Sequence, residues 1–209
     1  MGRSYLTVSG TTENKTEIRR SKFITTLAGI SDGESAEEFV RTIKRRYPDA
    51  THNCYAYIAD ERGTETRFSD DGEPSGTAGQ PMLEVLKKRG LVKAAVVVTR
   101  YFGGIKLGAG GLVGAYTDGV SQAIDKAAVV RMTECDEITF ECSYAEFPSL
   151  ESALKKAGAK TDDVVYGEGV RATFLAGTDN TEAAIAAVCA ASGGRVTAKA
   201  AGKRFAVLE

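Results

Sequence analysis

The chain has 209 residues, of which 43% are hydrophobic and 26% are charged, and such a composition is typical of a globular protein rather than a disordered one. The formal net charge is -1, so no overall field attracts the protein to nucleic acid or anionic lipid. The length suits one large domain or two small ones.

Sequence signals for a zinc site, a signal peptide or a membrane anchor are missing. Four cysteines lie far apart without a C-x-x-C pair, and the chain has one histidine, so a zinc site lacks ligands at workable spacing. We expect reduced thiols in a cytoplasmic protein with neither a metal nor a cofactor. The segment MGRSYLTVSG lacks a signal-peptide core, Leu6 breaks a myristoylation motif, and the apolar runs are too short for a bilayer, so we expect no membrane contact.

The first half of the chain begins with a strand and a helix. Residues 21–30 are rich in β-branched and aromatic side chains, which predicts a first strand starting within about twenty residues of the first residue. Residues 31–47 carry an apolar stripe at helical spacing, and Pro48 ends the predicted helix. Residues 52–60 alternate, which predicts a strand between two environments.

The alternation in residues 52–60 also indicates which side chains could face a ligand. Cys54 lies on the same side as Ala56, so we expect it to be buried in the core rather than to act as a nucleophile. Asn53 and Tyr55 lie on the opposite side and are candidates to face a ligand. Aromatic side chains at such positions either stack on nucleobases or pack against the sheet.

A polar loop and a glycine-rich turn follow. Residues 69–79 (SDDGEPSGTAG) combine carboxylates with glycines and a proline, which favours neither helix nor strand. Residues 81–90 form a predicted helix and residues 94–102 a buried strand. A glycine-rich turn then leads into a predicted helix over residues 111–128.

After about residue 132 the pattern changes to a compact series of elements. The series is strand 137–144, helix 147–158, strands 160–167 and 169–177, helix 180–193 and strand 194–201. The order β-α-β-β-α-β is the ferredoxin-like plan. We therefore place a domain boundary near residue 134.

The glycine-rich turn combines cations with a helix start. Six glycines within twelve residues surround Lys106 and follow a strand that ends in Arg100 and Tyr101. Exposed amides, the helix dipole and two cations suit a phosphate. Val113 occupies the third glycine position of G-x-G-x-x-G, and no Gly-Lys-Ser or Gly-Lys-Thr follows, so the dinucleotide and P-loop motifs are not met. A tight turn with close helix-to-sheet packing would explain the same glycines.

The carboxylates of the polar loop allow two interpretations. Asp70, Asp71 and Glu73 offer the oxygen ligands that Mg²⁺ prefers. They could equally pair with basic side chains and hold the loop in place, which we favour because no EF-hand spacing is present. The candidate basic partners are Arg67, Arg100 and Lys106. The hydroxyls of Ser75 and Thr77 either contact a phosphate or make ordinary turn hydrogen bonds.

We predict one ligand-binding surface, formed where three polar segments of the first half converge on a single concavity. Its residues are Asn53, Tyr55, Arg67, Ser69, Asp70, Asp71, Glu73, Ser75, Thr77, Arg100, Tyr101, Lys106, Gly108, Gly110 and Gly111. No nucleophile paired with a base is evident, so catalytic residues are not assigned. Three basic clusters, at residues 19–22, 44–46 and 87–89, are expected to end helices, where positive charge offsets the dipole.

Three long motifs resemble the YigZ/IMPACT family. They are THNCYAY, SDDGEPSGTAG and VVVTRYFGGIKLGAGGLVGAY, in this order and at these separations, and the resemblance spans nearly the whole chain. The last motif departs from the family at Gly114, where members commonly carry arginine, so one basic side chain is missing near the predicted phosphate site. The chain resembles the bacterial-type members, without the N-terminal module of the eukaryotic relatives.

The resemblance implies an α+β fold with two domains and a role in translation. Residues 1–134 would have the fold shared by a small-subunit ribosomal protein and domain IV of elongation factor G. Residues 135–209 would be a ferredoxin-like βαββαβ domain resembling domain V of that factor. Eukaryotic relatives modulate translational control through the pathway that senses amino-acid starvation. The implied partners are RNA, the ribosome or a translation-control protein, although a fold alone does not establish a function.

Three functions stay open on this basis. The leading hypothesis is a cytoplasmic, non-enzymatic, translation-associated regulatory protein that binds an RNA backbone or another phosphate-bearing ligand. The second is a small-molecule enzyme that binds a phosphate or nucleotide with the glycine-rich turn and the acidic loop. The third is a protein-interaction adaptor, which predicts an exposed apolar patch. The sequence leaves the oligomeric state open.

Overall fold

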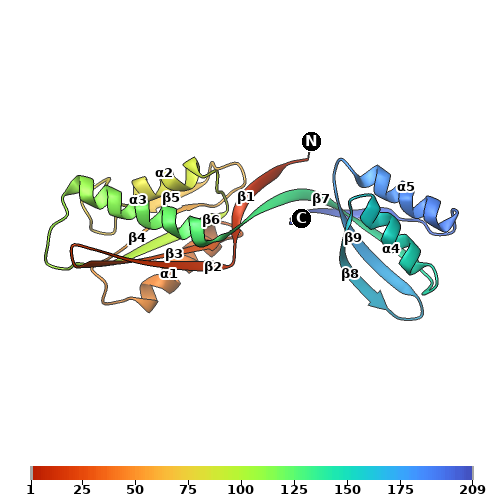
Figure 1. Cartoon of the computed structure of the whole chain (residues 1–209), viewed down its shortest axis with the longest axis horizontal. Coiled ribbons are helices and arrows are strands. Elements are labelled where there is room, and N and C mark those ends of the chain that lie inside the picture. Colours follow the sequence, from red (N-terminus) through yellow and green to blue (C-terminus); the bar gives the residue numbers. More distant parts are fainter. Residues whose placement is uncertain (1, 209) are drawn as a thin grey trace. The chain divides into compact units, whose positions relative to one another are not determined.

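The computed structural model describes residues 2–208, which form two compact units (Figure 1). One unit is Tyr5–Val130, and the other contains residues 2–4 and 131–208. The change of unit, between residues 130 and 131, and the boundary expected near residue 134 both fall inside strand β7 (Ala128–Cys142). Both units combine helices with an antiparallel sheet, so the predicted α+β class with two domains is confirmed.

The first unit is built on a sheet with the strand order β2-β3-β6-β4-β5. These strands are β2 (Thr11–Ile18), β3 (Ser21–Gly29), β6 (Ala94–Tyr101), β4 (His52–Ile58) and β5 (Thr66–Ser69). All four neighbouring pairs are antiparallel. In the register of the central strand β6, Arg100 lies opposite Phe23 of β3 on one side and opposite His52 of β4 on the other.

Helices cover both faces of this sheet (Figure 1). Helix α1 (Gly33–Arg46) packs on one face, while α2 (Gly79–Lys88) and α3 (Ala109–Lys126) pack on the other. The main core contains alternate residues of β4, including Cys54 and Ala56, and the α1 side contains Tyr55. The alternation that the sequence predicted for residues 52–60 is therefore confirmed.

The second unit has the predicted β-α-β-β-α-β order, with β7 pairing β9 on one side and β10 on the other. After β7 come α4 (Phe147–Lys156), β8 (Lys160–Tyr166), β9 (Val170–Gly177), α5 (Thr181–Ser192) and β10 (Lys199–Ala206). Strand β8 pairs only with β9 and lies at an edge of the sheet. Both helices share one core with the strands.

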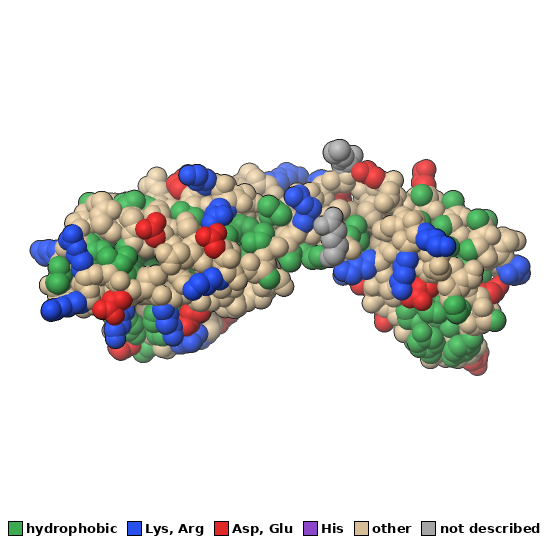
Figure 2. Space-filling model, viewed as in Figure 1, with side chains coloured by type: hydrophobic (Ala, Val, Ile, Leu, Met, Phe, Trp, Pro, Cys, Tyr) green, Lys and Arg blue, Asp and Glu red, His purple; other side chains and the backbone are tan. Residues whose placement is uncertain are grey.

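An exposed apolar patch lies at the end of the second unit that holds the β8–β9 hairpin, where Figure 2 shows hydrophobic side chains gathered. Its exposed members are Tyr144, Val165 and Tyr166, and the two tyrosine rings stack with their centroids 6.0 Å apart. The adaptor hypothesis predicts a patch of this kind.

The sequence patterns did not predict several strands, and they placed the start of the last strand too early. Strands β1 (Ser4–Ser9) and β2 precede the segment taken as the first strand, and β5 had not been anticipated. Strand β2 reads TTENKTEI and lies at a sheet edge, so it carries almost none of the apolar alternation used to find strands. The last strand begins at Lys199 rather than at residue 194, because Val196 and Ala198 are buried in an irregular segment before it.

Among the residues that the structure describes, no helix is both long and apolar enough to cross a lipid bilayer.

Candidate functional site

The three polar segments of the first half meet at one hollow of about 410 Å³. It lies where β4 begins, where β6 ends and where α3 starts. Its lining residues are Thr51, His52, Gly72, Glu73, Pro74, Arg100, Phe102, Lys106, Leu107, Gly108, Ala109 and Leu112. The geometry thus has the single concavity expected from the sequence, and what the concavity binds stays a prediction.

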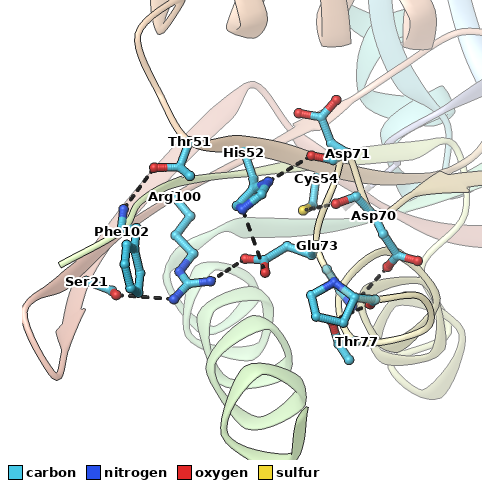
Figure 3. Close-up of polar contacts among 12 residues, drawn as sticks. Ser21, Thr51, His52, Cys54, Asp70, Asp71, Glu73, Thr77, Arg100 and Phe102 are labelled. Atoms are coloured by element: carbon cyan, nitrogen blue, oxygen red, sulfur yellow. Dashed lines mark hydrogen bonds and ion pairs between the residues drawn. The ribbon is translucent and has the colours of Figure 1, made fainter. Parts of the chain in front are cut away.

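A buried ion pair stands at the side of this hollow (Figure 3). Arg100 Nη1 donates to Glu73 Oε1 over 2.6 Å, and Arg100 Nη2 donates to Ser21 Oγ over 3.3 Å. The guanidinium lies between two rings, 5.4 Å from the centroid of Phe23 and 5.5 Å from that of Phe102. Arg100 is only 4% exposed, and its Nε–H has no acceptor among residues 2–208. Buried charges persist only when they are paired, so Glu73 must stay beside Arg100.

Glu73 also ties the polar loop to helix α3. Tyr116 donates its hydroxyl proton to Glu73 Oε1 over 2.7 Å, and burial raises the pKa of Tyr116. The Cys54 thiol lies in the same buried group and donates to the carbonyl oxygen of Asp70 over 2.9 Å. Burial raises the pKa of Cys54 to about 12, so the thiol stays protonated at neutral pH. The prediction that Cys54 is a core residue is confirmed.

His52 lies beside the ion pair with a defined tautomer. Its Nδ1 is 2.9 Å from the carbonyl oxygen of Asp71, and a carbonyl oxygen can only accept. The neutral imidazole therefore carries its proton on Nδ1 and presents Nε2 as an acceptor. That nitrogen lies 3.8 Å from Glu73 Oε2 (Figure 3). Sequence reasoning missed His52, because a single histidine gives no pattern, whereas its place opposite Arg100 follows from the register of β4 and β6.

The other two loop carboxylates shape the loop. Asp70 accepts from the backbone amides of Gly76, Ala78 and Gly79 at 2.8, 3.0 and 2.8 Å, and so prepares the start of α2. Asp71 accepts from Lys44 Nζ and from the amide of Asn53, each over 2.6 Å. These contacts are of the kind that the favoured interpretation expects, in which the carboxylates are used within the fold to hold the loop in place.

The partners of these carboxylates differ from those expected. Glu73 pairs with Arg100 as predicted, but Asp70 binds amides and Asp71 binds a lysine of α1. Neither pairs with Arg67 or Lys106. Within residues 2–208, no three His, Cys, Asp or Glu side chains are grouped so that they could hold a metal ion. The loop carboxylates thus face separate partners, which does not fit the magnesium interpretation.

Eleven of the fifteen predicted site residues do not line the hollow, and four of these lie outside both the polar loop and the helix start. Asn53 is buried, accepts from Thr99 Oγ1 over 2.7 Å and supports the loop after α1. Tyr55 and Arg67 line a separate, smaller hollow of about 280 Å³ under α1, where Arg67 pairs with Glu37 over 2.5 Å. Tyr101 donates its hydroxyl proton to Asp49. Tyr55 and Arg67 separate from the rest because their β4 and β5 positions face α1.

Of the remaining predicted residues, the hydroxyls serve the loop and the glycines serve the helix start. Ser69 Oγ accepts from the amide of Asp71, and Thr77 Oγ1 donates to the carbonyl of Pro74. Ser75 is exposed. Gly110 and Gly111 are exposed on the first turn of α3.

The N-terminus of α3 lacks a side-chain cap. Gly108 is the N-cap residue with φ 77°, and the first backbone bond runs from the amide of Leu112 to the carbonyl of Gly108. No side chain of the described residues therefore accepts a hydrogen bond from the amides of residues 109–111. Gly108 and Ala109 line the hollow, so this helix start opens into it. A helix of 18 residues carries partial positive charge at this end, which favours an anion.

Basic side chains surround this helix start. The turn between β2 and β3 holds Arg19 and Arg20, and Arg19 Nη1 donates to the carbonyl of Lys106 over 3.5 Å. A Cβ on Gly103 would lie 2.1 Å from the carbonyl carbon of Arg20, so only glycine lets the two turns touch. Arg19, Arg20 and Lys106 form no ion pair with a carboxylate in the described part of the chain, and we call these three residues the basic rim. Lys22 precedes Phe23 on β3, and the ring of Phe23 packs on α3, so the side chain of Lys22 projects from the other face of the sheet.

The basic rim corrects one expectation from the sequence. Residues 19–22 were expected to end a helix, but they form a hairpin turn and the start of β3. The other two clusters do end helices, with Lys44, Arg45 and Arg46 in the last turn of α1 and Lys87 and Lys88 in that of α2. A cluster in a turn has no helix dipole to offset, so its charge remains available to a ligand.

Comparisons with known proteins place the chain in one family. Residues 19–124 match the model of the Impact N-terminal domain, and residues 140–195 match a domain of unknown function, DUF1949. The IMPACT family member YvyE of Bacillus subtilis is 43% identical over 80% of this chain and 77% of its own length. The IMPACT family member YigZ of Escherichia coli is 43% identical over 69% of this chain and 72% of its own. The chain belongs to the IMPACT family.

A solved structure supports the same conclusion for both domains. It is a crystal structure described as that of a hypothetical protein, 35% identical, with a TM-score of 0.62. The match covers 97% of this chain and 98% of that one. The family resemblance found in the three motifs is therefore confirmed.

Asp70 and Ser75 lie in the same loop, but only Asp70 has partners there. We expect Asp70→Ala to lower the free energy of unfolding by about 2 kcal/mol, because three amides lose a charged acceptor. The control Ser75→Ala should change it by less than about 0.5 kcal/mol. Urea unfolding measures both, and equal losses would contradict the assigned role of Asp70.

We expect two ion pairs of similar length to differ in their contribution to stability, because one is buried and the other is exposed. Glu73→Gln leaves Arg100 charged and buried, so we expect a loss of about 3–5 kcal/mol of unfolding free energy. Arg67→Gln breaks an exposed pair with Glu37 and should cost about 0–1 kcal/mol. Chemical denaturation followed by circular dichroism compares the variants. A Glu73→Gln protein as stable as Arg67→Gln would show that the buried pair does not hold the loop.

Proposed function

We propose that this IMPACT family protein is a cytoplasmic, translation-associated regulatory protein whose N-terminal domain binds RNA or another phosphate-bearing ligand at the hollow. One observation carries the proposal: the uncapped start of α3 opens beside the basic rim. Backbone amides and the helix dipole favour an anion, and cations without carboxylate partners add to that field.

The distribution of charge supports a phosphate ligand more than the total charge does. The whole chain has a formal net charge of -1, so non-specific attraction to nucleic acid is weak. Most basic residues elsewhere in the first unit pair with carboxylates, for example Lys44 with Asp71 and Arg46 with Glu13. The basic rim is different, and its charge is concentrated within reach of one helix start.

The family resemblance supports translation as the setting. The first domain resembles the fold shared by a ribosomal protein and domain IV of elongation factor G, and the second resembles domain V of that factor. RNA, the ribosome or a translation-control protein would then supply the ligand. Fold resemblance alone does not assign a function, so the proposal depends on the site.

Binding is proposed rather than catalysis because two of the loop carboxylates and the Cys54 thiol are engaged within the fold. Asp70 and Asp71 already accept hydrogen bonds from amides and from Lys44. The high pKa of Cys54 keeps its thiol protonated and buried.

RNA binding should depend on the basic rim and on salt. We expect labelled single-stranded RNA to bind at about 50 mM salt and to lose affinity steeply by about 200 mM, because neutralised phosphates release counterions. Lys106→Gln and Arg19→Gln should each weaken binding and reduce the salt slope by about 1. Fluorescence anisotropy measures both quantities.

The matched control is Lys88→Gln, which removes an exposed lysine in the last turn of α2, outside the hollow, that pairs with no carboxylate among residues 2–208. It should leave affinity and slope nearly unchanged. Absence of RNA binding at low salt, or an equal loss in all three variants, would refute the proposed site.

A further inference from the structure

We propose that the hollow takes a single nucleotide whose base enters between its apolar walls and whose phosphate rests on the first turn of α3. The base would be one that carries an exocyclic amino group. This inference rests on the proposed function and deepens it, because it names the unit of the ligand that the hollow recognises.

The walls of the hollow fit a base better than a continuous phosphate backbone. Pro74, Phe102, Leu107 and Leu112 line it, and its volume of about 410 Å³ is that of a small-ligand pocket. A phosphate drawn between such side chains would lose hydration without gaining hydrogen bonds. An aromatic base gains free energy by leaving water for the same surface.

Phe102 offers a surface on which a base can stack. Its ring is 47% exposed although it follows the buried strand β6, and its amide is held by Thr51 Oγ1 over 3.0 Å. The guanidinium of Arg100 lies on the ring at 5.5 Å from the centroid. Exposed aromatic rings beside cations are the usual platform for single bases.

Two hydrogen-bond acceptors at the hollow lack a donor. Glu73 Oε1 takes the protons of Arg100 and Tyr116, which leaves Oε2 facing Nε2 of His52 at 3.8 Å. In the neutral imidazole Nε2 is itself an acceptor, because Nδ1 carries the proton, and no described residue then donates to either atom. An amino group with two protons can serve two neighbouring acceptors. Adenine, cytosine and guanine carry such a group, and uracil does not.

Arg100 keeps an unsatisfied donor beside the hollow. Arg100 lines the hollow, is 4% exposed and keeps an Nε–H without an acceptor in the described part of the chain. A base carries ring nitrogens or carbonyl oxygens that can accept beside its amino group. The Nε atom has almost no accessible surface, so a base in the hollow would reach it only after a movement of the Arg100 side chain.

The phosphate position follows from the same lining. Lys106, Gly108 and Ala109 line the hollow, and the amides of residues 109–111 are without side-chain acceptors. A base inside the hollow would therefore place its own phosphate at the mouth, on the helix start. A free mononucleotide and an unpaired nucleotide of an RNA share this chemistry.

The experiment compares ligands of matched charge by anisotropy and calorimetry at low salt. The probes are single-stranded oligo(C), oligo(U) and an abasic oligomer of equal length, together with free CMP, UMP and ribose 5-phosphate. We expect oligo(C) to bind at least about ten-fold more tightly than the abasic oligomer, because stacking adds to phosphate binding, and more tightly than oligo(U). CMP binding as tightly as oligo(C) identifies a free nucleotide as the ligand, and tight binding of oligo(C) alone identifies an RNA nucleotide.

Two variants and a control tie this preference to the hollow. Phe102→Ala should abolish the gain of oligo(C) over the abasic oligomer, and His52→Leu should reduce the preference for C over U. The control Phe68→Ala removes a phenylalanine that is 45% exposed on β5 and does not line the hollow, so it should keep both preferences. Circular dichroism checks that each variant is folded.

The possible failures are distinct. If the abasic oligomer and oligo(C) bind equally well, and Phe102→Ala changes neither affinity, the proposal that a base enters the hollow is wrong. Phosphate binding at the helix start would still stand. Equal binding of C and U ligands by the wild type overturns the amino-group preference. Absence of binding by every RNA and nucleotide overturns the proposed function as well.

Discussion

The buried ion pair of Glu73 and Arg100 holds the first domain's candidate site together. It joins the polar loop to the central strand β6, and Tyr116 extends the same contact to α3. Removing charges from water costs several kcal/mol per ion, and the cost is offset only while both partners and their hydrogen bonds are in place. The loop therefore cannot leave the strand without stranding a buried charge. The loop, the strand end and the helix start supply the walls of the hollow. The shape of the hollow therefore depends on this ion pair, which holds these three segments together.

The charges of the first domain divide into two groups with different roles. Asp70, Asp71 and Glu73 are used within the fold, as caps and ion pairs, which explains a polar loop in the middle of a compact domain. The basic rim has no carboxylate partner among the described residues and lies next to amides that the helix itself cannot satisfy. A protein of nearly neutral total charge can in this way present one local anion site without attracting nucleic acid over its whole surface.

The sequence predicted the elements with strong periodicity and missed what depends on tertiary pairing. The β4 alternation, the ferredoxin-like order and the gathering of three polar segments at a strand end followed from local patterns. The partner of Asp71 did not, because Lys44 comes from a helix on the other face of the sheet. Tyr55 and Arg67 were placed in the site because pattern alone does not say which face of a strand meets which helix. The roles of His52 and Arg19 depend on strand register and on a turn, which leave no periodic signal.

The central claim is that phosphate binds at the start of α3, and amide chemical shifts test it most directly. Titration of the isotope-labelled protein with inorganic phosphate at low salt should move the amide resonances of residues 109–111 most, with smaller changes at Lys106. Sulfate should act at the same residues, because both anions use the amides. Saturable shifts confined to the hollow under α1 or to the second domain, with residues 109–111 unmoved, would contradict the account.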